Sequence, residues 1–162
     1  MRNLTIRKAS ESDSDQIHQL LMDLAEFEKI THTVEATKES TRSALFGANP
    51  SAESLVAESG GQIVGTAIFF HNYSTFVGRK GLYLEDIYVK PDHRGQGIGR
   101  KILFRLAHVA EQRGCGRMEW TVLDWNSRAI DFYNEMGAEI LEEWKIVRLN
   151  SEGIKKLSDE EK

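Results

Sequence analysis

Three features of this sequence have residue types and spacing suited to chemistry: a glycine-rich segment, a pair of neighbouring carboxylates and a helical tyrosine. The glycine-rich segment, Arg94-Gly95-Gln96-Gly97-Ile98-Gly99-Arg100, lies between an apolar run at residues 82–89 and a helical pattern of apolar residues. Backbone N–H groups at a helix N-terminus favour phosphate oxygens, and glycines let a ligand approach closely. A glycine inside a helix costs about 1 kcal/mol, so three glycines in five residues favour a phosphate-binding loop over a plain turn.

The spacing of this loop excludes the two commonest phosphate-binding motifs. A dinucleotide fingerprint, G-x-G-x-x-G, needs a glycine where Arg100 stands, and a P-loop needs Gly-Lys-Ser/Thr at its end. What remains is R-x-x-G-x-G on Arg94, Gly97 and Gly99. This pattern resembles the pyrophosphate loop of the GCN5-related N-acetyltransferases (GNAT), which bind acetyl-CoA. The resemblance implies transfer of an acetyl group to an amine.

The two carboxylates, Glu85 and Asp86, interrupt an otherwise apolar strand just before the loop. An alkyl ammonium has a pKa of about 10.4, so an amine acceptor must lose a proton before it attacks. Glu85 and Asp86 are the best candidates to accept that proton, directly or through water. On a regular strand the two side chains face opposite ways, whereas a β-bulge brings both toward the reacting carbonyl. One of the two can instead be an ordinary outward residue.

Asn126 and Tyr133 follow the next expected strand, residues 118–123. If that strand neighbours residues 82–89, their carboxyl ends share one crevice, where open α/β sheets usually bind ligands. Tyrosine, with a pKa of about 10, stays protonated at pH 7 and can protonate a thiolate whose acid has a pKa of about 8.5. Tyr133 is therefore a candidate general acid, or else a core aromatic. Asn126 is a helix N-cap, a ligand for the pantetheine arm, or both.

The composition bounds the class of protein. The chain has 162 residues, 40% of them hydrophobic, and we expect one domain at residues 1–157 with a frayed tail at 158–162. A net charge of −4 without a basic run argues against a nucleic-acid partner. We expect no secretory signal and no membrane span, and the single cysteine, Cys115, fits a reducing cytoplasm. The five histidines lack metal-ligand spacing, so no metal is expected.

Hydrophobic periodicity predicts the elements that must position these residues. The expected order is β-α-α-β-β-β-α-β-α-β-β, an α/β (α+β) fold with a mixed, mostly antiparallel seven-stranded sheet and helices on both faces. A crossover helix joins the strands at 82–89 and 118–123, which should therefore be parallel. The other strands suit antiparallel pairing. The expected strands are residues 4–7, 54–57, 63–70, 82–89, 118–123, 140–141 and 145–149, and the expected helices are about 13–28, 37–46, 97–113 and 128–136.

Several segments resemble the diamine (spermidine/spermine) N-acetyltransferase family within the GNAT superfamily. They are residues 82–89, residues 94–99 and Val122-Leu123-Asp124-Trp125-Asn126. Leu24-Ala25-Glu26-Phe27-Glu28-Lys29 and Tyr73-Ser74-Thr75-Phe76 are most similar to the thialysine N-epsilon-acetyltransferase branch. The resemblance covers nearly the whole chain and implies the GNAT fold, acetyl-CoA as cosubstrate and a cytoplasmic homodimer.

The resemblance also implies roles for individual residues. Tyr133 is the implied general acid, and Glu85 is the implied acceptor of the amine proton. The implied acetyl-CoA ligands are Ile87, Tyr88, Val89, Arg94, Gly95, Gln96, Gly97, Ile98, Gly99, Arg100, Asn126 and Tyr133. The implied acceptor-side residues are Phe27, Glu28, Phe76, Glu85, Asp86, Glu142 and Trp144.

One departure from the family pattern concerns the acceptor. The polyamine branch carries Asp-Pro-Trp where this chain has Ser74-Thr75-Phe76, so one acceptor carboxylate is missing. This favours an amino acid such as thialysine, or a small diamine, over spermine. We therefore expect direct acetyl transfer to a small primary amine in a ternary complex. The alternatives are a non-catalytic acyl-CoA-binding regulatory module and a protein-lysine acetyltransferase.

Overall fold

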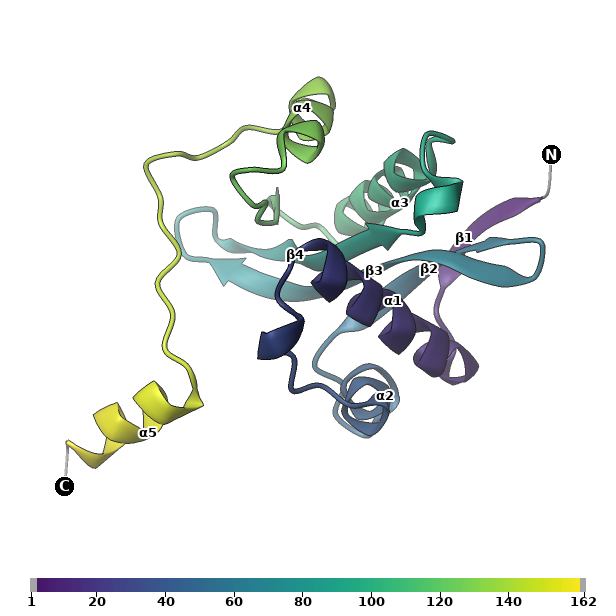
Figure 1. Cartoon of the computed structure of the whole chain (residues 1–162). Coiled ribbons are helices and arrows are strands. Elements are labelled where there is room, and N and C mark those ends of the chain that lie inside the picture. The colour runs from purple at the N-terminus through teal and green to yellow at the C-terminus, as the bar shows by residue number, and fades with distance from the viewer. Residues whose placement is uncertain (1–2, 161–162) are drawn as a thin grey trace. The chain divides into compact units, whose positions relative to one another are not determined.

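A sheet of five strands in the order β1-β2-β3-β4-β5 is the centre of this computed structural model, which describes residues 3–160. The strands are β1 Leu4–Lys8, β2 Glu53–Ser59, β3 Gln62–Ser74, β4 Arg79–Val89 and β5 Met118–Glu119 (Figure 1). The helices are α1 Ser14–Phe27, α2 Lys38–Phe46, α3 Ile98–Gln112, α4 Ser127–Glu135 and α5 Ser151–Asp159, with 3₁₀ turns η1 Glu11–Asp13, η2 Thr31–Thr33 and η3 Pro91–His93.

The pairing of the strands confirms a mixed, mostly antiparallel sheet. Neighbours from β1 to β4 pair antiparallel, and β4 pairs with β5 in parallel through the crossover helix α3. The turn between β2 and β3 places Gly60 and Gly61 at φ of 59° and 78°, a region that glycine enters at little cost. The expected hairpin at residues 54–70 is therefore confirmed.

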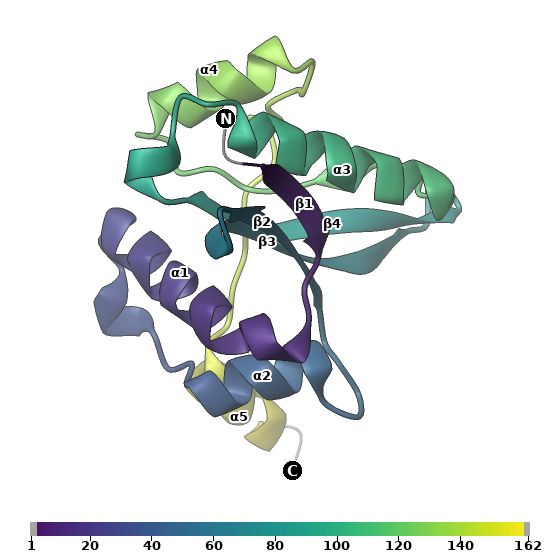
Figure 2. The same ribbon diagram turned by 90° about the vertical axis from the view of Figure 1, so that its right-hand side faces the viewer.

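Residues 1–121 form one unit of the chain, with helices on both faces of the sheet. Figure 2 shows α1 and α2 on one face and α3 on the other. On α1, Ile17, Leu20 and Leu24 recur at helical spacing and are buried in a core with Val56 and other strand residues. The opposite layer repeats this pattern on α3, where Ile98, Ile102, Leu103, Leu106 and Ala110 are buried.

Residues 122–162 form a second unit, which contains α4 and α5. Among the described residues, 140–141 and 145–149 are not strands, so the sheet has five strands and the expected seven are not confirmed. The run between α4 and α5 contains a turn, in which the Trp144 N–H donates to the Leu141 carbonyl oxygen, and no described strand. The exposed fractions of Trp144 and Val147 are 74% and 93%. An alternating pattern makes a strand only where a neighbouring strand supplies hydrogen bonds. The apolar residues in this run were therefore not enough to make it a strand.

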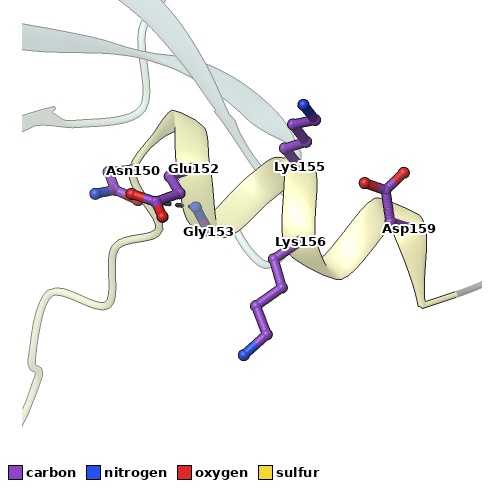
Figure 3. Close-up of a pocket in the computed structure, with 6 residues that line it drawn as sticks. All are labelled: Asn150, Glu152, Gly153, Lys155, Lys156 and Asp159. Atoms are coloured by element: carbon purple, nitrogen blue, oxygen red, sulfur yellow. Dashed lines mark hydrogen bonds between the residues drawn. The ribbon is translucent and has the colours of Figure 1, made fainter.

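The helix α5 was not expected from the sequence. Asn150 caps it, because its Oδ1 accepts a hydrogen bond of 2.9 Å from the Gly153 N–H. Part of the expected frayed tail, residues 158–159, is helical, and residues 161–162 lie outside the described residues. A shallow surface hollow lies along this helix, and its charged side chains diverge into solvent (Figure 3). The hollow contains none of the predicted site residues.

Within residues 3–160, no helix combines the length and the apolar composition needed to cross a bilayer.

Candidate active site

A β-bulge in β4 sets the geometry of the two predicted carboxylates. In the register of β3 and β4, Ile68 pairs with Asp86 and Phe69 pairs with Leu84, so Glu85 is the extra residue. Of the two arrangements that the sequence left open at this point, a regular strand and a bulge, the structure has the bulge. Glu85 is exposed and Asp86 is partly buried. Because a bulge breaks strict alternation, adjacent side chains of β4 need not point to opposite faces of the sheet.

The C-terminal end of α1 adds a third carboxylate to this pair. Burial, together with the negative charges of Glu85 and Glu28, raises the pKa of the Asp86 carboxyl to about 6. Burial also raises the pKa of Glu28, which caps α1. Glu28, Glu85 and Asp86, the acidic cluster, give this part of the first unit a concentrated negative potential. Such a potential attracts a cation, and an amine is a cation at neutral pH.

Beside the bulge, one edge of β4 pairs with no strand of the first unit. The strand pairs with β5 only at two positions, Leu82 with Met118 and Tyr83 with Glu119. From Leu84 to Val89, no described strand covers that edge. Exposed strand edges pair readily with an extended ligand that carries amide groups. The predicted cofactor residues Ile87, Tyr88 and Val89 lie on this stretch, where backbone pairing is possible.

The glycine-rich loop follows β4 and η3 and leads into α3. Gly95 and Gly97 have φ of 76° and 74°, so backbone conformation explains why glycine stands at these two of the three positions. Gly97 is the N-cap of α3, and no side chain caps the helix. The N–H groups at the start of the first helical turn, such as those of Ile98 and Gly99, therefore point out of the helix end.

Gly99 is the most informative residue of the loop. It is not among the residues with positive φ, and a Cβ built on it would meet no atom within 4 Å. Neither backbone conformation nor packing within the described chain requires glycine here, although glycine lowers the stability of a helix by about 1 kcal/mol. The open space above Gly95, Gly97 and Gly99 fits a ligand that approaches the backbone, as the pyrophosphate of acetyl-CoA would.

Arg94, the first residue of the predicted motif, has contacts that the sequence did not predict. Its Nε donates a hydrogen bond of 2.9 Å to the carbonyl oxygen of Val89. Its guanidinium lies 5.2 Å from the ring centroid of Phe27 and 5.2 Å from that of Tyr88. Both distances are within the range of a cation–π contact. Phe27 is far from Tyr88 and Arg94 in sequence, so no local pattern reveals its contact with Arg94.

The predicted residues of the second unit are described within that unit alone. Asn126 is the N-cap of α4, because its Oδ1 accepts a hydrogen bond of 3.3 Å from the Ala129 N–H. Tyr133 is 7% exposed, and its ring centroid lies 5.5 Å from that of Phe132. Glu142 and Trp144 lie on the run between α4 and α5, both exposed. The roles of these four residues toward the first unit stay predictions.

Phe76 is at the tip of the β3–β4 hairpin and is 99% exposed. Glu85 lies about 20 Å along β4 from its first residue, at about 3.3 Å per residue. The structure thus brings Glu28, Glu85 and Asp86 together but leaves Phe76 at the far end of the hairpin. Among the described residues, no group of three or more His, Cys, Asp or Glu is arranged to hold a metal ion.

Known proteins resemble this chain in both sequence and fold. The model of the acetyltransferase (GNAT) family matches residues 15–138. The thialysine N-epsilon-acetyltransferase of Mus musculus is 41% identical, with 98% of this chain and 99% of the mouse protein covered. L-ornithine N5-acetyltransferase NATA1 of Arabidopsis thaliana is 29% identical, with 92% and 85% covered. Among solved structures, the V. cholerae integron cassette protein VCH_CASS6 has a TM-score of 0.79 at 22% identity, with 96% and 97% covered.

Proposed function

This chain belongs to the acetyltransferase (GNAT) family, and on that premise we propose that it acetylates a small primary amine by direct transfer within a ternary complex. The chain is an enzyme that transfers acetyl groups to amines, like its curated relatives. The observation that carries the finer proposal is the acidic cluster. Glu85 and Asp86 lie on β4, the strand that leads to the glycine loop, and Glu28 lies at the end of α1.

The donor side of the proposed site uses β4 and the start of α3. Acetyl-CoA, when bound, supplies the acetyl group as a thioester. The unpaired edge at Ile87, Tyr88 and Val89 suits the amides of a pantetheine arm. The loop from Gly95 to Arg100 offers backbone N–H groups and positive helix-dipole potential to a pyrophosphate. Asn126 and Tyr133 complete the proposed cofactor contacts.

The acceptor side of the proposed site is the acidic cluster. Its three carboxylates bind the cationic amine, and Phe27 supplies an aromatic face at the end of α1. Two relatives act, by name, on thialysine and on L-ornithine, which are both amino acids with a side-chain amine. This supports an amino acid with a side-chain amine, or a short diamine, as the acceptor. Phe76, Glu142 and Trp144 remain proposed acceptor contacts.

Three proton transfers complete the proposed mechanism. The carboxylate of Glu85 accepts a proton from the bound ammonium through water, which leaves the amine neutral for attack. Tyr133 donates its phenolic proton to the departing sulfur, and the second proton that the nitrogen loses on becoming an amide returns to the Tyr133 phenolate. Because a thiol has a pKa of about 8.5 and tyrosine about 10, the thiolate leaves fairly readily and the acid contributes near the low end of the usual 10²–10⁴-fold.

We also propose that residues 1–157 act as a single N-acetyltransferase domain and that the protein is a cytoplasmic homodimer. The resemblance to the diamine N-acetyltransferase family over nearly the whole chain supports this organisation. Sedimentation of the purified chain measures the mass directly, and a monomer at assay concentration would contradict the dimer.

Initial-rate kinetics with both substrates varied test the ternary complex. Direct transfer predicts intersecting double-reciprocal lines for acetyl-CoA and amine. Parallel lines would indicate an acetylated enzyme and would contradict the proposal. Binding of CoA in calorimetry without thiol release on any amine would instead support a non-catalytic acyl-CoA-binding module.

A further inference from the structure

The contact between Arg94, Phe27 and Tyr88, here called the arginine stack, joins the glycine loop to the end of α1. The guanidinium lies 5.2 Å from each ring centroid, and Nε donates to the Val89 carbonyl oxygen at 2.9 Å. Tyr88 belongs to β4 and is buried, whereas Phe27 is the last residue of α1. The hydrogen bond and the two ring contacts together hold the guanidinium where the end of β4 meets the end of α1.

The backbone just beyond Phe27 is strained. Lys29 has φ of 60°, the only described non-glycine residue with a positive φ. A non-glycine residue in this region persists when its surroundings hold it there. Two hydrogen bonds do so in part, from Lys29 N–H to the Glu26 carbonyl (3.1 Å) and from Ile30 N–H to the Ala25 carbonyl (2.9 Å). The arginine stack is a third, tertiary restraint on the same turn.

The residue between Phe27 and Lys29 is Glu28, a member of the acidic cluster. Its charge acts on Asp86, so the position of the α1 end decides how the carboxylates face an acceptor. We propose that Arg94 is a positioning residue: it fixes the end of α1 against β4 and so places Glu28 for amine binding. It acts on the acceptor side, and it is not a ligand of the pyrophosphate. This inference rests on the proposed function for its acceptor.

Arg94→Met tests the inference against a matched arginine of the same loop. Loss of a cation–π contact of about 1 kcal/mol predicts a rise of about fivefold in the KM of the amine, with kcat changed less. In calorimetry, the Kd of CoA stays within about twofold for Arg94→Met and rises for Arg100→Met. Arg105→Met, on the exposed face of α3, controls for the loss of one positive charge.

A double-mutant cycle separates the stack from a general loss of structure. Phe27→Ala and Arg94→Met each raise the amine KM, and the double variant is no worse than the more affected single variant. Additive effects would contradict the inference, and so would a CoA Kd that rises as much in Arg94→Met as in Arg100→Met with the amine KM unchanged.

Hydrogen exchange provides a readout that does not depend on turnover. In Arg94→Met, the amides of Glu28, Lys29 and Ile30 exchange faster by about fivefold, while those of α3 keep the wild-type rate. If the wild type acetylates no small amine but these amides still respond, the proposed acceptor fails and the positioning role of Arg94 survives. Unchanged exchange at all three amides would overturn the positioning role itself.

Discussion

Glu85 is the extra residue of the β-bulge in β4. It has no partner in the register of β3 and β4, and the bulge that it forms lies beside a second carboxylate, Asp86. The sequence allows a bulge at this point, because two acidic residues interrupt an apolar run, but it does not decide between a bulge and a regular strand. It does not indicate Glu28, whose charge reaches Asp86 from the end of α1. Local pattern marks where an irregularity can form, whereas the third carboxylate depends on how α1 packs on the sheet.

The pH dependence of amine binding follows from Asp86. Its pKa of about 6 means that the carboxyl is charged at pH 7 and mostly neutral at pH 5, while an alkyl ammonium with a pKa of about 10.4 stays charged throughout. Calorimetry of an amine binding to CoA-loaded enzyme should show affinity falling by about tenfold from pH 7 to pH 5. Asp86→Asn should remove most of this pH dependence of the amine affinity. The smaller pH dependence that is left comes from Glu28. A wild-type slope in the variant would contradict the assignment.

The role proposed for Tyr133 has its own signature. Tyr133→Phe removes the phenolic proton and keeps the ring, so we expect kcat to fall by about 10²-fold with little change in the KM of acetyl-CoA. Stopped-flow or steady-state thiol release measures both. Unchanged kcat would mean that Tyr133 is a core aromatic only, the alternative that its 7% exposure also fits.

At the scale of elements, helices with a strong apolar period were predicted well. The expected helices at 13–28 and 97–113 correspond to α1 Ser14–Phe27 and α3 Ile98–Gln112. Their periodic side chains meet the sheet directly, so sequence and structure agree. The arginine stack could not be predicted, because residues 27, 88 and 94 meet only after α1 and β4 have packed.

The start of α3 offers a test in which stability and binding change in opposite directions. Gly99→Ala adds a methyl group where no atom lies within 4 Å, so the free energy of unfolding should rise by up to about 1 kcal/mol. The same methyl occupies space that the pyrophosphate needs, so the Kd of CoA should rise by about tenfold or more. Urea unfolding and calorimetry measure the two quantities. Tighter or equal CoA binding would contradict a phosphate-binding role for this turn.

The junction of β1 with η1 carries a pH-dependent contribution to stability. Arg7 donates hydrogen bonds to both carboxylate oxygens of Asp13, at 2.7 and 3.0 Å, and lowers the pKa of Asp13 to about 2. A lowered pKa means that the stabilisation is complete above about pH 4 and is lost as the pH falls toward 2. Asp13→Asn should therefore cost about 2 kcal/mol at pH 7 and about 1 kcal/mol at pH 3.

Urea unfolding at the two pH values measures this difference, and Asp15 supplies a control. Asp15 pairs with Arg42 at 3.3 Å, but both side chains are about half exposed. Asp15→Asn should change the free energy of unfolding by less than about 0.5 kcal/mol. An equal cost for both substitutions, or a cost for Asp13→Asn that does not shrink at pH 3, would contradict the account of Asp13.

At the scale of the whole molecule, the fold class was predictable but the strand count was not. Alternating and apolar runs predicted β1 to β4. β2, β3 and β4 pair with their neighbours in sequence, whereas β1 pairs with β2 about fifty residues later. The run at 140–149 has similar apolar residues, yet it forms no strand among the described residues. Strand formation depends on a partner that a single segment does not encode.

The central claim, acetylation of a small primary amine, is tested most directly by kcat/KM across one panel of acceptors. The panel is thialysine, lysine, ornithine, putrescine, spermidine, spermine and a short lysine peptide, all at fixed saturating acetyl-CoA and followed by thiol release. The account predicts the highest kcat/KM for thialysine or another small amine with one cationic side chain. A kcat/KM that is highest for spermine or for the lysine peptide would contradict it.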